Sequence, residues 1–237
     1  MSTTRRRIAA LLIVAAMMQG CSVPLPVPPA TVARYDFDEY AEWHDRSGRG
    51  PDLTVAGNNT ATAVHVPHGR GRAIRFPEPC RVKPCPRLIL RTPSRPDLQP
   101  GSRDLRFGAS VRLAPEFTSE GQNVLQKGYS TEGSQYKLQI DGYAGRPSCV
   151  LVGAPDRLIR RAVADVIVSD GRWHRLECRR TGTAFLVLVD GTPRGAVPVP
   201  SGLTVADDDP LLIGGKSVSQ SNDQFHGSVD DVWIAID

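Results

Sequence analysis

The chain has 237 residues, of which 23% are charged and 6% are aromatic, and its formal net charge is +4. The first twenty residues hold three arginines and no acid, so the charge of the remainder falls by three, to about +1. This balance argues against a nucleic-acid partner, because affinity for phosphate backbones depends on clustered Lys and Arg. The length suits one β-sandwich domain, which commonly runs to roughly 200–250 residues.

The N-terminus has the pattern of an export signal. Arg5, Arg6 and Arg7 form a basic segment, and the apolar run 8–18 is too short to span a bilayer. Residues 18–21, Met-Gln-Gly-Cys, resemble a bacterial lipobox, in which the cysteine is lipidated and becomes the new N-terminus. We expect a signal peptide over residues 1–20 and a lipid on Cys21, with ordinary cleavage before Ala33 as the alternative. Either route exports the chain, to the outer face of the cell membrane or into the medium.

The following segment is rich in proline. Pro24, Pro26, Pro28 and Pro29 predict an extended tether of polyproline type over residues 21–32. From residue 33 onward, short runs of Val, Leu and Ile are separated by clusters of Gly, Pro, Asp and Ser, and no helical period persists beyond about two turns. The pattern indicates one all-β domain over residues 33–237.

Three runs predict strands most clearly. In residues 104–113 the apolar side chains Leu105, Phe107, Ala109, Val111 and Leu113 share one face. In residues 135–141, Tyr136, Leu138 and Ile140 alternate with polar residues in the same way. Residues 185–189 are apolar on both faces and end in the turn dipeptide Asp190-Gly191. Residues 158–168 favour a strand over a short helix, whereas His65 and His68 fall in an expected loop.

Five cysteines are present, and four remain if Cys21 carries lipid. An even number in an exported protein favours disulfides over a metal site. Cys80 and Cys85 enclose four residues and predict a bridge that clamps a loop. Cys149 and Cys178 lie in two separate strand-like runs, so a second bridge would connect neighbouring strands of one sheet. The other pairings stay formally open.

Three late segments, taken in order, carry a family resemblance. They are 170–176 (DGRWHRL), 185–191 (FLVLVDG) and 225–234 (FHGSVDDVWI). They resemble signatures of the LamG-like jelly-roll group of concanavalin A-like lectins and glucanases, and residues 35–38 (YDFD) and 45–50 (DRSGRG) resemble its first strand and following loop. The resemblance covers nearly all of residues 33–237. It implies a two-sheet antiparallel jelly-roll sandwich.

Within this resemblance, the two tryptophans of the motifs have structural interpretations. We expect Trp173 to pack and His174 to form local hydrogen bonds after the Asp170-Gly171 turn. Trp233 faces away from the core side of its strand, where it either covers the outer surface of a sheet, which we favour, or offers a platform for a sugar ring.

The resemblance also implies a candidate calcium site. In related glucanases, an aspartate at the start of the terminal strand holds a calcium ion together with main-chain oxygens of the first strand and an early loop. Asp230 occupies the matching position, and Asp36 lies in the expected first strand. Such a structural Ca²⁺ would tie the two chain ends together. Surface aspartates that cap a turn are the alternative interpretation.

Catalytic motifs are missing from the sequence. The related glucanases use a pair of carboxylates in an E-x-D-x-x-E motif on one strand, and this chain has no such motif. The nearest acids, Glu116 and Glu120, fall in an expected turn with the wrong spacing. We therefore expect no enzyme, and no cofactor apart from the structural calcium ion that the resemblance implies.

The resemblance favours a recognition module instead. Members of the superfamily usually bind sugars or proteins on the concave sheet or at its rim, which in this chain would place Arg106, Arg112, Lys137, Gln139 and Arg175 on one ligand-binding face. Arginine-rich faces suit acidic or hydroxyl-rich glycans, although an ordinary solvated face explains the same residues. The expected partner is a glycan or an envelope protein, bound by a monomer that meets the membrane only through its lipid. The alternative is a lipid-anchored structural or protein-interaction component of the envelope without sugar specificity.

Overall fold

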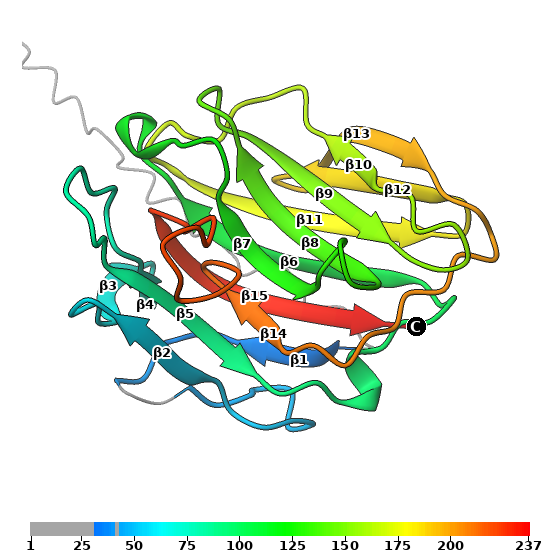
Figure 1. The fold of residues 1–237 in the computed structure, drawn as a ribbon, viewed down its shortest axis with the longest axis horizontal. Helices are drawn as coiled ribbons and strands as arrows, with labels where there is room; N and C mark the ends of the chain where they lie inside the picture. The colour runs from blue at the N-terminus through cyan, green and yellow to red at the C-terminus, as the bar shows by residue number, and fades with distance from the viewer. Residues whose placement is uncertain (1–30, 41–42) are drawn as a thin grey trace, which may run out of the picture.

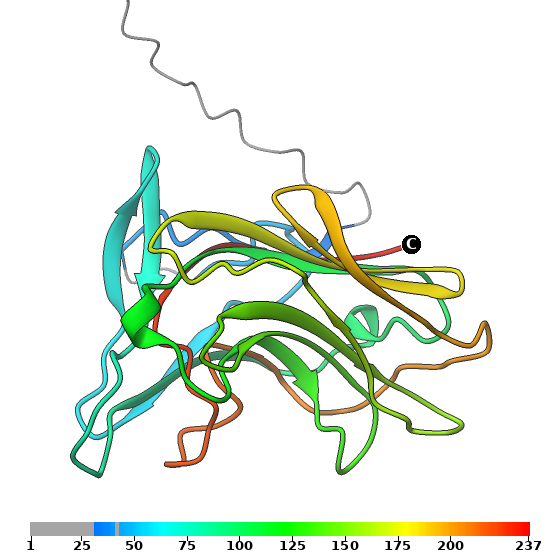
Figure 2. The ribbon, with the colours of Figure 1, turned by 90° about the horizontal axis from the view of Figure 1, so that it is seen from above.

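The computed structural model describes residues 31–40 and 43–237. These residues form two antiparallel sheets that stack face to face (Figures 1 and 2). The expected signal peptide, Cys21 and nearly all of the expected tether lie outside the described residues. Among the described residues, no helix is both long and apolar enough to cross a membrane.

The described residues place eight strands in one sheet and seven in the other. The eight-stranded sheet has the order β13-β12-β11-β6-β15-β4-β3, and β1 also pairs with β15. Its strands are β1 (Thr31–Tyr35), β3 (Val64–His68), β4 (Gly71–Arg75), β6 (Leu105–Arg112), β11 (Trp173–Thr181), β12 (Ala184–Val189), β13 (Thr192–Pro198) and β15 (Ser228–Ile236). The seven-stranded sheet has the order β10-β9-β8-β7-β14-β5-β2. Its strands are β2 (Thr54–Asn58), β5 (Arg87–Thr92), β7 (Asn123–Gly128), β8 (Gln135–Asp141), β9 (Arg146–Val152), β10 (Arg160–Val163) and β14 (Leu211–Ile213). Two short 3₁₀ turns are η1 (Pro96–Leu98) and η2 (Pro115–Phe117).

The core lies between the sheets and follows the predicted alternation. The apolar faces of β6 and β8 are fully buried, with Phe107 and Tyr136 in contact at 5.1 Å between ring centroids. Burial of each large apolar side chain contributes roughly 1.5–3 kcal/mol. The two-sheet antiparallel fold and the strands 105–112, 135–141 and 184–189 are therefore confirmed.

Both predicted disulfides are present. Cys80–Cys85 closes the short loop before β5. Cys149–Cys178 joins β9 to β11, and these strands belong to different sheets. The expectation that this bridge connects neighbours in one sheet was wrong, because sequence alternation shows that a cysteine points inward and does not show which sheet it points from.

The last strand, β15, ties the chain ends together. It pairs with β6 along one edge, while its other edge pairs first with β4 and then with β1. A bulge interrupts the β6 pairing between Asp230 and Trp233, and Asp231 there has a positive φ of 45°. A bulge redirects the side chains beside it, so Asp230 and Asp231 are presented at a local irregularity of the sheet.

Some predicted boundaries differ from the structure. β1 begins at Thr31, two residues before the expected start of the domain. Residues 160–163 alone form a strand within the run 158–168. His65 and His68 belong to β3, not to a loop. Pro67, between the two histidines, pairs with Arg72 of β4. Because β3 is an edge strand, the backbone N–H that proline lacks is not needed there.

Candidate functional site

The five predicted ligand-binding residues do not share one face. Arg106 and Arg112 lie on β6 and Arg175 lies on β11, in the eight-stranded sheet. Lys137 and Gln139 lie on β8, in the seven-stranded sheet. All five point away from the core, so the two groups lie on opposite outer surfaces of the sandwich. The prediction of a single face was wrong, because alternation assigns a side to each strand without assigning the strand to a sheet.

The arginines of the eight-stranded sheet have partners within the chain. Arg106 lies 3.5 Å from the Asp237 carboxylate, and the Arg112 Nε donates to the Gly171 carbonyl at 2.7 Å. The Arg175 guanidinium lies 5.6 Å from the centre of the Trp233 ring. Trp233 itself is only 2% exposed. It covers the outer surface of the sheet, as favoured, and is not available as a sugar platform.

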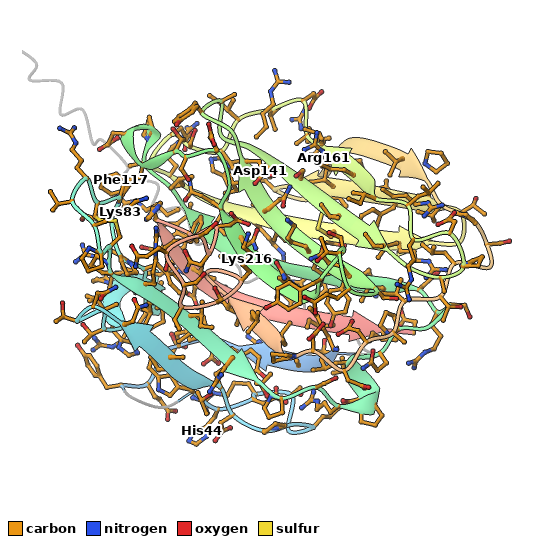
Figure 3. All side chains as sticks on the ribbon, viewed as in Figure 1. His44, Lys83, Phe117, Asp141, Arg161 and Lys216 are labelled. Atoms are coloured by element: carbon orange, nitrogen blue, oxygen red, sulfur yellow. A yellow bond between two sulfur atoms is a disulfide. The ribbon has the colours of Figure 1, made fainter. Side chains whose placement is uncertain are left out.

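The outward side of the seven-stranded sheet carries many polar side chains, of which Asn123, Gln126, Gln139 and Ser148 are buried and the others are partly or fully exposed. We call it the polar face and define it by Asn123, Gln126, Lys137, Gln139, Asp141, Ser148 and Arg161. The strand register places Arg161, Val150, Lys137, Gln126, Leu212 and Arg91 in one row across β10, β9, β8, β7, β14 and β5. Figure 3 looks onto this surface, where Asp141 and Arg161 are labelled.

Lys137 lies near the centre of that row with its ammonium unpaired. The side chain is half-buried, and its ammonium makes no hydrogen bond or salt bridge with any residue that the structure describes. Burial lowers the pKa of Lys137, while the charges of Asp141 and Asp223 act in the opposite direction. Desolvating a cation without a close partner costs free energy, which indicates that this position is kept for something other than stability.

Asp141 is the acid of the polar face. Burial raises its pKa, and the nearby Lys137 charge opposes that effect. Its carboxylate accepts hydrogen bonds from the Gln139 side-chain amide and the Gln122 backbone N–H. Asp141 is thereby fixed in position, close enough to Lys137 for their charges to interact.

Amide side chains form the next row of the polar face. Asn123 and Gln139 pair across β7 and β8, and Ser148 follows on β9. The Asn123 amide donates to Gln126 at 2.7 Å, and the Gln139 amide donates to Ser148 at 3.1 Å. Within the described residues, the Asn123 and Gln139 side-chain oxygens have no hydrogen-bond partner. Because Asn123, Gln139 and Ser148 are all buried, this row is a hydrogen-bonded layer that holds the neighbouring strands in position and does not itself reach the solvent.

The loop between β14 and β15 forms one wall of the polar face. Figure 2 shows this orange-red loop extending beyond the seven-stranded sheet, away from the other sheet. The Asp223 carbonyl accepts from the Asn123 backbone N–H at 2.8 Å, and Lys216 pairs with the Asp223 carboxylate at 2.8 Å. The Tyr129 hydroxyl donates to the Lys216 carbonyl at 2.6 Å. Sequence patterns did not reveal Lys216 and Asp223, because loops carry no periodic signal.

The two predicted calcium ligands have separate partners. Asp36 accepts from the Arg46 guanidinium at 3.3 Å. Asp230 is bonded to His68 Nδ1 at 2.5 Å, and Asp231 lies beside both. Within the described chain, the grouped metal-ligand atoms here are those of His68, Asp230 and Asp231, a mixed nitrogen and oxygen set without Asp36. Calcium prefers six to eight oxygens, so this side-chain set fits it poorly, and calcium binding stays a prediction.

The histidine of the DGRWHRL segment forms local hydrogen bonds, as expected. Its two ring nitrogens lie 2.8 Å from the Asp190 carboxylate and 3.1 Å from that of Asp170. Asp190 and Gly191, at the β12–β13 turn, both have positive φ. His174 therefore links two turns at one end of the sheet, which is a structural role.

Comparisons with known proteins agree with this architecture. A family model described as "Concanavalin A-like lectin/glucanases superfamily" matches residues 102–235, more than half of the chain. A search of curated proteins finds no significant match.

Similar solved structures include domain 4 of AbnA, a GH43 extracellular arabinanase from Geobacillus stearothermophilus, in complex with arabinotriose. It has a TM-score of 0.65 and 15% identity over 87% of this chain and 92% of that one. The binding domain of Paraclostridial Mosquitocidal Protein 1 has a TM-score of 0.64 and 11% identity, over 87% and 48%. The receptor binding domain of botulinum neurotoxin D has a TM-score of 0.62 and 11% identity, over 87% and 49%. The chain thus spans about half the length of the two toxin domains, and the likeness establishes the fold.

Proposed function

The chain belongs to the concanavalin A-like lectin/glucanase superfamily, and we propose that it is a noncatalytic recognition module that binds a hydroxyl-rich or acidic glycan on the polar face. The observation that carries the proposal is the half-buried Lys137 ammonium, which has no hydrogen-bond or salt-bridge partner among the described residues. A ligand oxygen placed there gains a charge-assisted hydrogen bond. The half-buried Asp141 and the exposed Arg161, on the same outer surface as Lys137, supply further polar groups that a sugar can contact.

The acid of the polar face, Asp141, and the acid of the adjacent loop, Asp223, support binding without cleavage. Glycosidases use two carboxylates that flank the scissile bond. Here Asp223 is neutralised by Lys216 at 2.8 Å, and Asp141 is held by Gln139 and Gln122. The arabinanase domain that shares this fold is in complex with arabinotriose, which supports a glycan as the class of ligand.

The two disulfides support an extracellular ligand. The described residues contain two disulfides. Disulfides persist in oxidising compartments and are rare in cytosolic proteins. We retain lipidation of Cys21 as part of the proposal, with one lipid-anchored monomer presented outside the membrane. Mass spectrometry of the native N-terminus tests this part: a lipidated Cys21 supports it, and a free N-terminus elsewhere overturns it.

A glycan array with the purified protein tests the proposed ligand. We expect binding to a restricted group of glycans, loss of that binding in Lys137→Gln, and retention in Arg106→Gln, which removes a charge from the opposite sheet. No release of reducing ends from a bound glycan is expected. Equal binding by all three proteins, or turnover of the glycan, overturns the proposal. If no glycan on the array binds and a pulldown with the protein recovers one envelope protein, the alternative is supported, namely a structural component of the envelope.

A further inference from the structure

A second concave site lies on the opposite side of the sandwich, near one end of the eight-stranded sheet. It is a pocket of about 250 Å³ whose wall includes Arg75, Arg112, Trp173, Ser228, Glu78 and Phe117. None of these residues belongs to the polar face. The pocket is smaller than the roughly 300 Å³ at which sites for drug-sized ligands begin, so it suits one sugar unit more than an oligomer.

Strand register explains why these side chains converge. Ser228 on β15 pairs with Arg75 on β4 and with Arg112 on β6, and Arg112 pairs with Trp173 on β11. Directly paired residues point to the same side of a sheet, so the four form one row on the outer surface. Neighbouring strands are about 4.8 Å apart, which places the two arginine backbones about 10 Å apart with the serine hydroxyl between them.

The charges of the pocket favour an anion. Arg112 is fixed by its bond to the Gly171 carbonyl. Arg75 is exposed and makes no hydrogen bond or salt bridge within the described part of the chain. Glu78 is the acid among the lining residues, so one positive charge remains in excess. Arg75 therefore offers a planar fork of N–H donors to a carboxylate.

The aromatic wall favours a sugar ring over a small free anion. The Trp173 ring stacks on the His68 ring with 3.9 Å between centroids. His68 is in turn bonded to Asp230, so the indole is held in one orientation. A fixed aromatic surface beside a few directed polar groups is typical of small-ligand sites.

We propose that this pocket binds a hexuronic acid unit, with its carboxylate on Arg75, its hydroxyls on Arg112, Ser228 and Glu78, and its ring against Trp173. This is a second site, independent of the ligand on the polar face. With two sites, the module can hold an acidic sugar on one sheet while the other sheet binds another segment of the same glycan or a different glycan.

Titration calorimetry with the full chain tests the pocket. The probes are methyl glucuronide and methyl glucoside, which differ only in the carboxylate. We expect the glucuronide to bind at least tenfold more tightly than the glucoside, and Arg75→Gln to lower its affinity to that of the glucoside. Arg70→Gln removes an exposed arginine from the same hairpin outside the pocket and is expected to bind as the unaltered chain does.

Three outcomes overturn the proposal. They are equal affinity for the two probes, unchanged affinity in Arg75→Gln, and complete competition by acetate at the concentration of the glucuronide. Lys137→Gln separates the two sites: it is expected to keep glucuronide binding even if it abolishes binding on the polar face. Loss in Lys137→Gln but not in Arg75→Gln assigns the acidic sugar to the polar face and refutes the pocket.

Discussion

Lys127 and Lys137 lie on neighbouring strands of one sheet and show opposite uses of the same residue type. Lys127 points into the sandwich, where its ammonium bonds the Asp207 carboxylate at 2.8 Å and two backbone carbonyls. Lys137 points outward and has no such partner among the described residues. Lys127 therefore stabilises the fold, whereas Lys137 is a desolvated charge kept at a cost.

This contrast predicts opposite effects of the same substitution. Lys137→Met is expected to raise the free energy of unfolding by about 1 kcal/mol, because it removes a half-buried cation that has no close partner among the described residues. Lys127→Met is expected to lower it by about 3 kcal/mol or more, because it leaves the buried Asp207 charge unpaired. Urea denaturation of both variants measures the two changes. A loss of stability in Lys137→Met contradicts our assignment of that residue to binding.

Asp230 makes stability depend on pH. Burial raises its pKa from 3.8 to about 6, and the hydrogen bond with His68 opposes this. As pH rises from about 4 to 6, the unfolded chain releases this proton before the folded chain does, so the stability that Asp230 contributes at low pH is lost. The shift corresponds to a loss on the order of 3 kcal/mol.

Asp230→Asn removes this titration and still permits a hydrogen bond to His68. Compared with the unaltered protein, the variant is expected to gain free energy of unfolding between pH 4 and pH 7, by up to about 3 kcal/mol. Urea denaturation at pH 4, 5, 6 and 7 gives the difference. If the free energies of unfolding of the two proteins differ by the same amount at every pH, Asp230 does not titrate in this range.

At the scale of the strand, sequence predicted the inward and outward sides well. Leu105, Leu138 and Ile234 share one core because an apolar side chain at every second position marks the buried face of a strand. The partner of each strand was not predictable in the same way. Arg106 and Lys137 follow the same local pattern, yet lie on opposite sheets, since pairing is decided by contacts far apart in the sequence.

The two disulfides are expected to differ in their contribution to stability. Cys149–Cys178 closes a loop with a separation of 29 residues, and Cys80–Cys85 one of 5. Loop-closure entropy in the unfolded chain then gives about 3.6 kcal/mol for the first bridge and about 2 kcal/mol for the second. Thermal unfolding of the two double Cys→Ala variants measures both. A larger loss from removing Cys80–Cys85 contradicts the assignment of the longer bridge as the main constraint.

At the scale of the molecule, the family motifs predicted the sandwich but not the position of the site that we propose. The motif residues Trp233 and His174 are occupied in packing and in local hydrogen bonds. The polar face instead combines β8, whose alternation was visible in the sequence, with a loop that brings Lys216 and Asp223 beside it (Figure 3). The loop lies beside β8 only in the folded chain, because the two segments are far apart in the sequence.

The most direct test is amide chemical-shift mapping of the protein with a glycan selected on the array. Our account predicts that the largest shifts fall on β7, β8 and β9 around Lys137 and Gln139, and that Lys137→Gln abolishes them. Shifts confined to β6, β11 and β15, with the resonances around Lys137 unmoved, would contradict it.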